Sequence, residues 1–195
     1  MGERWRPKSD RVQFTGQDLE ADFLGDGPAE IRYDGSTYQT FKEAFQNVIK
    51  HQPSHRDKSG QARPWDAEDP PMPLPNALQF LVKEQLEERL KDPELSLGFY
   101  NALGTELDKR YGIDAILVLE SKGERAFVSI DITSNPNKTA HKADLILQVP
   151  ATFFDDEIYP AKNREPFLEE WSKRITDAFF KKIFLKRTSS TPSRR

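Results

Sequence analysis

Two neighbouring segments, 113–120 and 125–132, are rich in aliphatic and β-branched residues, and this pattern predicts two β-strands. A glycine lies in the short turn between them, so the strands are expected to pair as a hairpin with Lys122 and Gly123 as its loop. Strand alternation then gives one face that is uniformly apolar and a second face of mixed character. The apolar face predicts the side of the hairpin that packs against the core.

The N-terminal part of the chain shows a second strand-like pattern followed by a helical one. Residues 30–39 contain Asp34-Gly35 between two short strand-like runs, which predicts a small β-hairpin. Thr40 and Glu43 form a capping-box pattern, and apolar residues at helical spacing follow it. A helix is therefore expected to end near residue 51.

Further helices and one more strand are expected in the rest of the chain. An apolar stripe follows Asn76, a possible N-cap, and the helix should end before Pro93. A second helix is expected from about residue 95 to residue 110, with its apolar stripe leaving one glutamate at the edge of the buried face. Residues 143–149 predict a strand, and residues 166–186 predict an amphipathic helix.

These elements predict one α/β (α+β) domain with attachments, which suits a chain of 195 residues. Six prolines fall among charged residues before the first core helix, and proline disfavours both helix and sheet. The expected division is an N-terminal hairpin-helix unit (1–51), a proline-rich linker or long surface loop (52–75), a core with a C-terminal helix (76–187) and a disordered basic tail (188–195).

Composition narrows the classes of function. Charged residues make up 31% of the chain, and no run of 18 apolar residues could span a bilayer, so a soluble protein without a membrane role is expected. The chain contains no cysteine, and its first residues lack the apolar stretch of a secretory signal, which favours a cytoplasmic or nuclear location. A net charge of −3 argues against a protein that coats nucleic acid over its whole surface.

One basic region lies in the last 25 residues of the chain. Its candidate phosphate-binding residues are Lys181, Lys182, Lys186 and Arg187. The alternative is a solvated helix face that ends in a basic tail. Phe180 and Phe184 lie off the main apolar side of the same helix, so this region could also form a homodimer or partner surface.

The hairpin carries the most specific chemical signal. With the expected loop, Asp114 faces Asp131 across the two strands. Two like charges in opposite positions destabilise a hairpin unless something compensates, and a shared cation would do so. Oxygen ligands without nearby cysteine favour Mg²⁺ or Mn²⁺, which can assist phosphodiester hydrolysis. The alternative is that both aspartates are simply hydrated at the rim of the sheet.

These residues resemble the PD-(D/E)XK nuclease superfamily over roughly residues 95–150. The resemblance implies a restriction-endonuclease-like core with a mixed central sheet flanked by helices, and a metal-dependent endonuclease that acts on DNA. It implies that Gly112-Ile-Asp114 holds the first metal-binding acid and Ile130-Asp131-Ile-Thr133 the second. Glu106 resembles the helical glutamate that many members use as a further metal ligand. The strand that the family has between its first helix and first acid is not evident.

The chain departs from the family pattern at Thr133, where a lysine is expected two residues after the second acid. A lysine there would orient the attacking water and offset charge on the phosphate, and a threonine hydroxyl replaces it poorly. The segment that follows predicts a short helix with Asn135 as its cap and Pro136 in its first turn. Lys138 and Lys142 would then share a face, which makes both candidate catalytic residues. The alternative is an exposed lysine pair.

Two other functions stay open. The protein could be a nuclease-fold module that has lost activity with its lysine and now binds nucleic acid or a protein partner. It could also be an unrelated α+β scaffold, in which the two aspartates would lie on different faces of the sheet.

Overall fold

The computed structural model describes residues 16–56, 62–139, 142–150, 152–155 and 163–189. At its centre is a four-stranded sheet in the order β3-β4-β5-β6, in which β6 is parallel to β5 and the other neighbours are antiparallel. The strands are β3 (Ser96–Asn101), β4 (Ala115–Ser121), β5 (Glu124–Thr133) and β6 (Leu145–Gln148). The mixed α/β class and the mixed central sheet are therefore confirmed.

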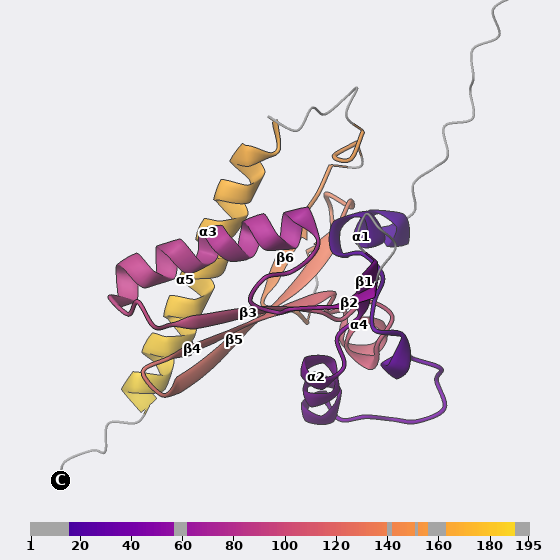
Figure 1. The fold of residues 1–195 in the computed structure, drawn as a ribbon, viewed down its shortest axis with the longest axis horizontal. Coiled ribbons are helices and arrows are strands. Elements are labelled where there is room, and N and C mark those ends of the chain that lie inside the picture. Colours follow the sequence, from indigo (N-terminus) through magenta and orange to yellow (C-terminus); the bar gives the residue numbers. More distant parts are fainter. Residues whose placement is uncertain (1–15, 57–61, 140–141, 151, 156–162, 190–195) are drawn as a thin grey trace, which may run out of the picture.

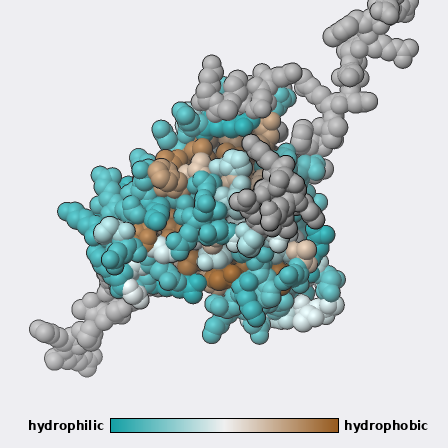
Figure 2. Space-filling view, viewed as in Figure 1, coloured by the Kyte–Doolittle hydropathy of each residue, from teal (hydrophilic) through white to brown (hydrophobic). Residues whose placement is uncertain are grey.

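Helices cover both faces of this sheet (Figure 1). One face, called here the α3/α5 face, packs against α1 (Gly16–Leu24), α3 (Pro73–Leu90) and α5 (Glu165–Ser189). The other, the α2/α4 face, packs against α2 (Phe41–Lys50) and α4 (Glu106–Tyr111). Within the described residues, no helix combines the length and the apolar character that crossing a membrane requires. The side of the molecule seen in Figure 2 is mostly hydrophilic, with small hydrophobic areas between the polar side chains.

The central hairpin has the predicted register. β4 pairs with β5 from Ser121↔Glu124 to Ala115↔Ile130, and Lys122 and Gly123 form the loop. Both loop residues have positive φ angles, 50° and 77°, as a tight two-residue turn requires. The uniformly apolar side of the hairpin lies on the α3/α5 face, so the predicted core side is confirmed.

The helix α2 also begins where its capping box predicts. The Thr40 hydroxyl accepts a hydrogen bond from the Glu43 N–H, and the Glu43 carboxylate accepts one from the Thr40 N–H at 2.8 Å. These two bonds satisfy backbone donors that the first turn of a helix leaves free. The local sequence alone therefore fixes the start of α2.

The predicted hairpin over residues 30–39 is wrong. The segment begins with a 3-10 helix, η1 (Ala29–Ile31), and has no strand after it. The Asp34 carboxylate accepts hydrogen bonds from the residue two positions later, and the Tyr33 N–H donates to the Gly104 carbonyl at 2.7 Å. The backbone of this loop is thus satisfied locally and by the turn before α4, so it needs no partner strand.

The helix predicted over residues 95–110 is also wrong, because this segment contains β3, a turn and α4. Leu97 and Phe99 are buried on the α3/α5 face as strand residues. Gly104 then adopts a left-handed φ of 73°, and the Thr105 hydroxyl caps α4. A strand between α3 and the first acid, which the sequence did not reveal, is therefore present.

The proline-rich region is more than a linker. It contains an antiparallel pair of short strands, β1 (Ser54–Arg56) and β2 (Ala62–Pro64). The following Trp65 is buried, and its indole N–H donates to the Phe99 carbonyl of β3 at 2.8 Å. This region therefore packs against the sheet instead of only connecting two elements.

The two long helices differ from prediction at their ends. α3 begins with Pro73 at its first position, whereas the Asn76 side chain bonds to the Asp69 carboxylate and does not cap the helix. It ends at Leu90, as predicted. α5 includes residues 188–189, which were expected in a disordered tail, and residues 190–195 of that tail lie outside the described residues.

Candidate functional site

The two aspartates of the hairpin lie at one end of the central sheet, and both side chains are buried. Asp131 belongs to β5, and Asp114 lies one residue before β4, just beyond the last regular pair of the ladder. There the Asp114 N–H bonds to the Ile130 carbonyl, and the Asp114 carboxylate accepts a hydrogen bond from the Ile132 N–H at 2.6 Å. The carboxylate of Asp114 is thus held against the strand that carries Asp131.

Lys138 completes an ion pair with the second aspartate. Its ammonium lies 2.8 Å from one carboxylate oxygen of Asp131 and 2.7 Å from the other. The short helix predicted for this segment is wrong within residues 134–139, which form a turn. In that turn Asn135 accepts a hydrogen bond from the Asn137 N–H. Lys138 therefore reaches Asp131 from a turn, and the Thr133 hydroxyl accepts a hydrogen bond from the Asn135 N–H.

Glu20 on α1 joins this cluster, although it was not among the residues predicted for the site. Burial, the largest cause, raises the pKa of Glu20 to about 7. The carboxylates of Asp108 and Asp131 raise this pKa further, whereas Lys109 and Lys138 lower it. The pKa of Glu20 therefore depends on charged groups both at the hairpin and on α4.

A signal for Glu20 was present in the sequence. Leu19, Phe23 and Leu24 follow helical spacing and are buried in the core. They mark the short amphipathic helix α1, which was not among the predicted elements. Because Glu20 adjoins this stripe, it lies at the edge of the buried side of α1 and only partly in solvent.

Asp114 carries the strongest electrostatic perturbation at the site. Burial raises the pKa of Asp114 well above its usual range, and the nearby Glu20 carboxylate is the next largest cause. Asp108 and Asp131 add to this effect, whereas the hydrogen bond from Ile132 opposes it. The cluster therefore holds more negative groups than its lysines neutralise, and it favours either bound protons or an additional cation.

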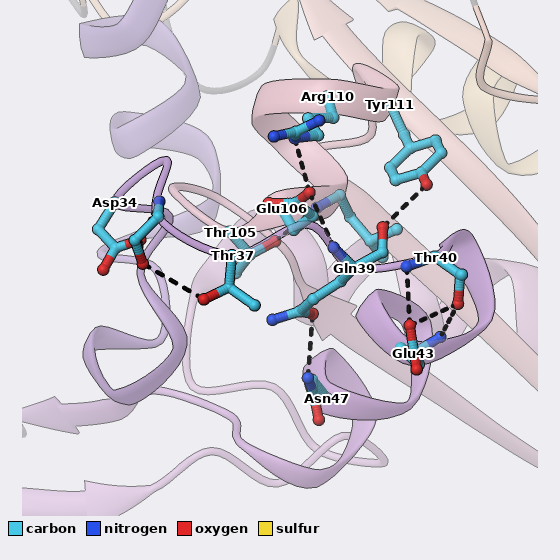
Figure 3. Close-up of polar contacts among 12 residues, drawn as sticks. Asp34, Thr37, Gln39, Thr40, Glu43, Asn47, Thr105, Glu106, Arg110 and Tyr111 are labelled. Carbon is cyan, nitrogen blue, oxygen red and sulfur yellow. Dashed lines mark hydrogen bonds and ion pairs between the residues drawn. The ribbon is translucent and has the colours of Figure 1, made fainter.

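Glu106, the predicted helical metal ligand, has other partners. Its carboxylate forms an ion pair with Arg110 at 2.7 Å and accepts a hydrogen bond from the Gln39 N–H at 3.4 Å (Figure 3). The largest charge effects on Asp114 come from Glu20, Asp108 and Asp131 instead. Glu20 is thus the helical glutamate that shares the electrostatic environment of the hairpin acids.

The remaining predicted lysine of this region, Lys142, makes different contacts from Lys138. Its ammonium donates to the Arg110 carbonyl at 2.8 Å and lies 5.8 Å from the centre of the Tyr111 ring. The structure therefore brings Lys138, and not Lys142, to the hairpin carboxylates.

The basic residues predicted on α5 have mixed surroundings. Lys182 bonds to the Asp144 carboxylate at 2.6 Å and lies 4.4 Å from the centre of the Phe127 ring, so it joins α5 to the sheet. Although burial opposes it, the bonds from Lys182 and Ser129 hold the pKa of Asp144 below its usual range. Lys181 is exposed on the same helix, and the side chains of Lys186 and Arg187 lie outside the described residues.

The donor set at this end of the sheet suits a hard divalent cation in its chemistry. Asp114, Asp131 and Glu20 offer only carboxylate oxygens, the ligands that Mg²⁺ and Mn²⁺ prefer. Among the residues that the structure describes, no three acids, histidines or cysteines are close enough to form a ready metal site. Binding would therefore require a carboxylate to move or Lys138 to release an oxygen of Asp131.

A scan of protein family models, a search of curated proteins and a search of solved structures each found no match for this chain.

Proposed function

We propose that the protein is a metal-dependent nuclease that hydrolyses phosphodiester bonds, with DNA as its substrate. The observation that carries the proposal is the ion pair of Lys138 with both oxygens of Asp131, next to two carboxyl groups, Asp114 and Glu20, whose pKa values are raised. Perturbed carboxylates beside a positioned lysine are typical of catalytic sites.

The order of the elements gives independent support. The resemblance to PD-(D/E)XK nucleases requires a helix, a strand, an antiparallel hairpin with an acid on each strand, and a further strand. The chain has α3, which precedes the span of the resemblance, then β3, the β4–β5 hairpin and β6. Asp131 lies on β5, and Asp114 lies one residue before β4. The chain departs from the family in the connection to β6, which contains no crossover helix within residues 134–139 and 142–144.

The acidic residues and the lysine of the site would have different roles in the reaction. Asp114 and Asp131 would hold the cation, with Glu20 as a further oxygen donor in place of Glu106. When bound, Mg²⁺ or Mn²⁺ supplies polarisation of the phosphodiester and a lower pKa for a bound water. Lys138 provides the positive charge that Thr133 cannot, and its ammonium can donate to a phosphate oxygen as negative charge develops there.

Nicking of supercoiled plasmid DNA with Mg²⁺ or Mn²⁺ tests the proposal. We expect Asp131→Asn and Lys138→Met each to lower the rate by about 10²–10³-fold or more, because each removes a group that stabilises charge at the reacting phosphate. Lys83→Met is the matched control, since Lys83 pairs with Glu87 on α3 at 4.0 Å and should leave nicking unchanged.

A catalytically inactive binding module is the second candidate function, because Thr133 replaces the family lysine and Lys138 occupies both oxygens of Asp131. This alternative predicts no nicking by the unchanged protein with either ion. It also predicts nucleic-acid binding that persists in EDTA and in Asp131→Asn. A thermal shift on addition of Mg²⁺ that Asp131→Asn abolishes would favour the nuclease.

A further inference from the structure

Tyrosines and cations gather beside the acid cluster on the loop before α2 and on α4. The Arg110 guanidinium lies 5.7 Å from the centre of the Tyr33 ring and 5.1 Å from the centre of the Tyr38 ring, so it lies close to both rings. Lys142 lies beside the Tyr111 ring in the same region. We call this set, with Arg32, the tyrosine-arginine surface.

The loop that carries this surface is held in place by several bonds. Glu106 pairs with Arg110 and also receives the Gln39 N–H, while the Tyr111 hydroxyl donates to the Gln39 carbonyl at 3.1 Å (Figure 3). Tyr38 nevertheless remains 65% exposed. The loop therefore presents an aromatic ring to solvent in a prepared position.

Hollows connect this surface to the acid cluster. A groove of about 350 Å³ is lined by Glu20, Asp108 and Lys109 and also by Arg32 and Tyr33. A second hollow continues from Tyr33 along the loop, and a third is lined by Tyr38. An extended ligand could therefore lie along the loop with one end at the acids.

The charge of the surface is modest. Arg110 is paired with Glu106, and Lys109 with Asp108, and the hollows are also lined by the carboxylates of Asp26, Glu30 and Asp34. Within the part of the chain that the structure describes, no carboxylate pairs with Arg32, and Lys142 bonds only to a backbone carbonyl. Only a few phosphates could be neutralised here, so aromatic stacking must supply most of the affinity of a nucleic-acid ligand.

We propose that the tyrosine-arginine surface binds an unpaired, single-stranded stretch of the DNA substrate, with bases stacked on Tyr38 and Tyr33 and phosphates near Arg32 and Lys142. The inference rests on the proposed function, because the groove that Arg32 and Tyr33 line also reaches Glu20 of the acid cluster. Every base offers a flat face for stacking, whereas the bases of a duplex are already stacked on one another and cannot use these rings.

Binding of labelled oligothymidine and of a blunt duplex, measured by fluorescence anisotropy in EDTA, tests this surface without cleavage. We expect the single strand to bind more tightly, and Tyr38→Ala to weaken it by about 5–150-fold, the loss typical of one base–aromatic stack. Tyr38→Phe should keep affinity within about threefold, because the ring remains. Phe80→Ala, which removes a 55% exposed ring from α3, should have no effect.

Salt provides a second measurement of the same proposal. With two phosphate contacts, a plot of log affinity against log salt concentration should have a slope of about −1.4 for the single strand. Arg32→Ala should reduce the slope to about half of that value, whereas Tyr38→Ala should leave it unchanged.

Equal affinity for duplex and single strand, or full affinity in a folded Tyr38→Ala variant, would overturn the assignment. These outcomes differ from failure of the proposed function. If the protein nicks DNA and Tyr38→Ala does not change its affinity for the single strand, the nuclease proposal stands and the proposed binding surface is wrong. If the protein does not nick DNA but requires the Tyr38 ring to bind single strands, the binding surface stands and the nuclease proposal is wrong.

Discussion

The two faces of the central sheet use the same strands for different purposes. On the α3/α5 face, the side chains of β4 and β5 meet a continuous apolar core that includes Trp171 and Phe179. On the α2/α4 face the apolar cluster is smaller, and Asp114, Asp131 and Glu106 are buried near it. Lys138 pairs with Asp131 and Arg110 with Glu106, but the buried Asp114 carboxyl group has a raised pKa. Because a buried carboxylate costs folding energy unless it is paired, the first face stabilises the fold, whereas the second contains an unfavourable group at Asp114. Such a cost is expected at a functional site.

Truncation on the α3/α5 face should have the largest effect on stability. Trp171 is buried among the rings of Phe23, Phe153 and Phe167. Trp171→Ala should lower the free energy of unfolding by about 3–5 kcal/mol, because it leaves a large cavity. Urea denaturation measures this loss, with exposed Phe80→Ala as the control, which should change stability by less than about 0.5 kcal/mol. If Trp171→Ala lowered the free energy of unfolding as little as Phe80→Ala, the α3/α5 face would not be the part of the sheet that stabilises the fold.

A substitution on the α2/α4 face should act in the opposite direction. Asp114→Asn keeps an oxygen that can accept the Ile132 N–H but removes a buried carboxyl group whose pKa is raised. We expect the free energy of unfolding at pH 8 to rise by roughly 1–3 kcal/mol, while nicking is lost. Denaturation and nicking of the same preparation check both effects. A variant that is destabilised would show that the charge of Asp114 is compensated in the folded protein.

The free energy of unfolding should also depend on pH through Glu20, and this effect is expected to be smaller than those of the two substitutions above. The pKa of Glu20 is raised from 4.5 to about 7 in the folded protein, so folding favours its protonated form. Its contribution is fully present below pH 4.5 and is lost as the pH rises through 7. Glu20→Gln should remove this loss in the free energy of unfolding. The loss is roughly 1–2 kcal/mol, because solvent that reaches this half-buried group weakens the effect.

Denaturation of the wild-type protein and of Glu20→Gln across this pH range gives the difference directly. Addition of Mg²⁺ should flatten the wild-type curve, because a cation near Glu20 favours its ionised form. Two curves that stay parallel at all pH values would contradict the raised pKa of Glu20.

The features predicted correctly from sequence are those whose cause is local. The Thr40 and Glu43 pair fixes the start of α2 with two bonds that span three residues. Lys122 and Gly123 fix the β4–β5 register in the same way, because the loop length sets which residues oppose each other. The same register places Asp131 near Asp114, whereas Lys138 reaches Asp131 from a turn and not from the short helix that was predicted.

The features that were missed depend on contacts distant in sequence. The loop around Tyr33 takes its backbone partner from Gly104, so its Asp-Gly turn does not become a hairpin. Residues 95–110 have spacings that fit a helix, but burial of β3 between two layers overrides them. Glu20 belongs to the site only because α1 packs near the hairpin. The local sequence of α1 does not show that these two elements contact each other.

The buried Trp65 has a consequence for how this protein behaves in a crowded solution. β3 forms an outer strand of the sheet, and an open strand of that kind can recruit a strand from another molecule. The Phe99 N–H bonds to the Ala67 carbonyl, and the Phe99 carbonyl receives the Trp65 indole N–H. The proline-rich segment thus covers this border and protects it against the addition of a strand from another molecule.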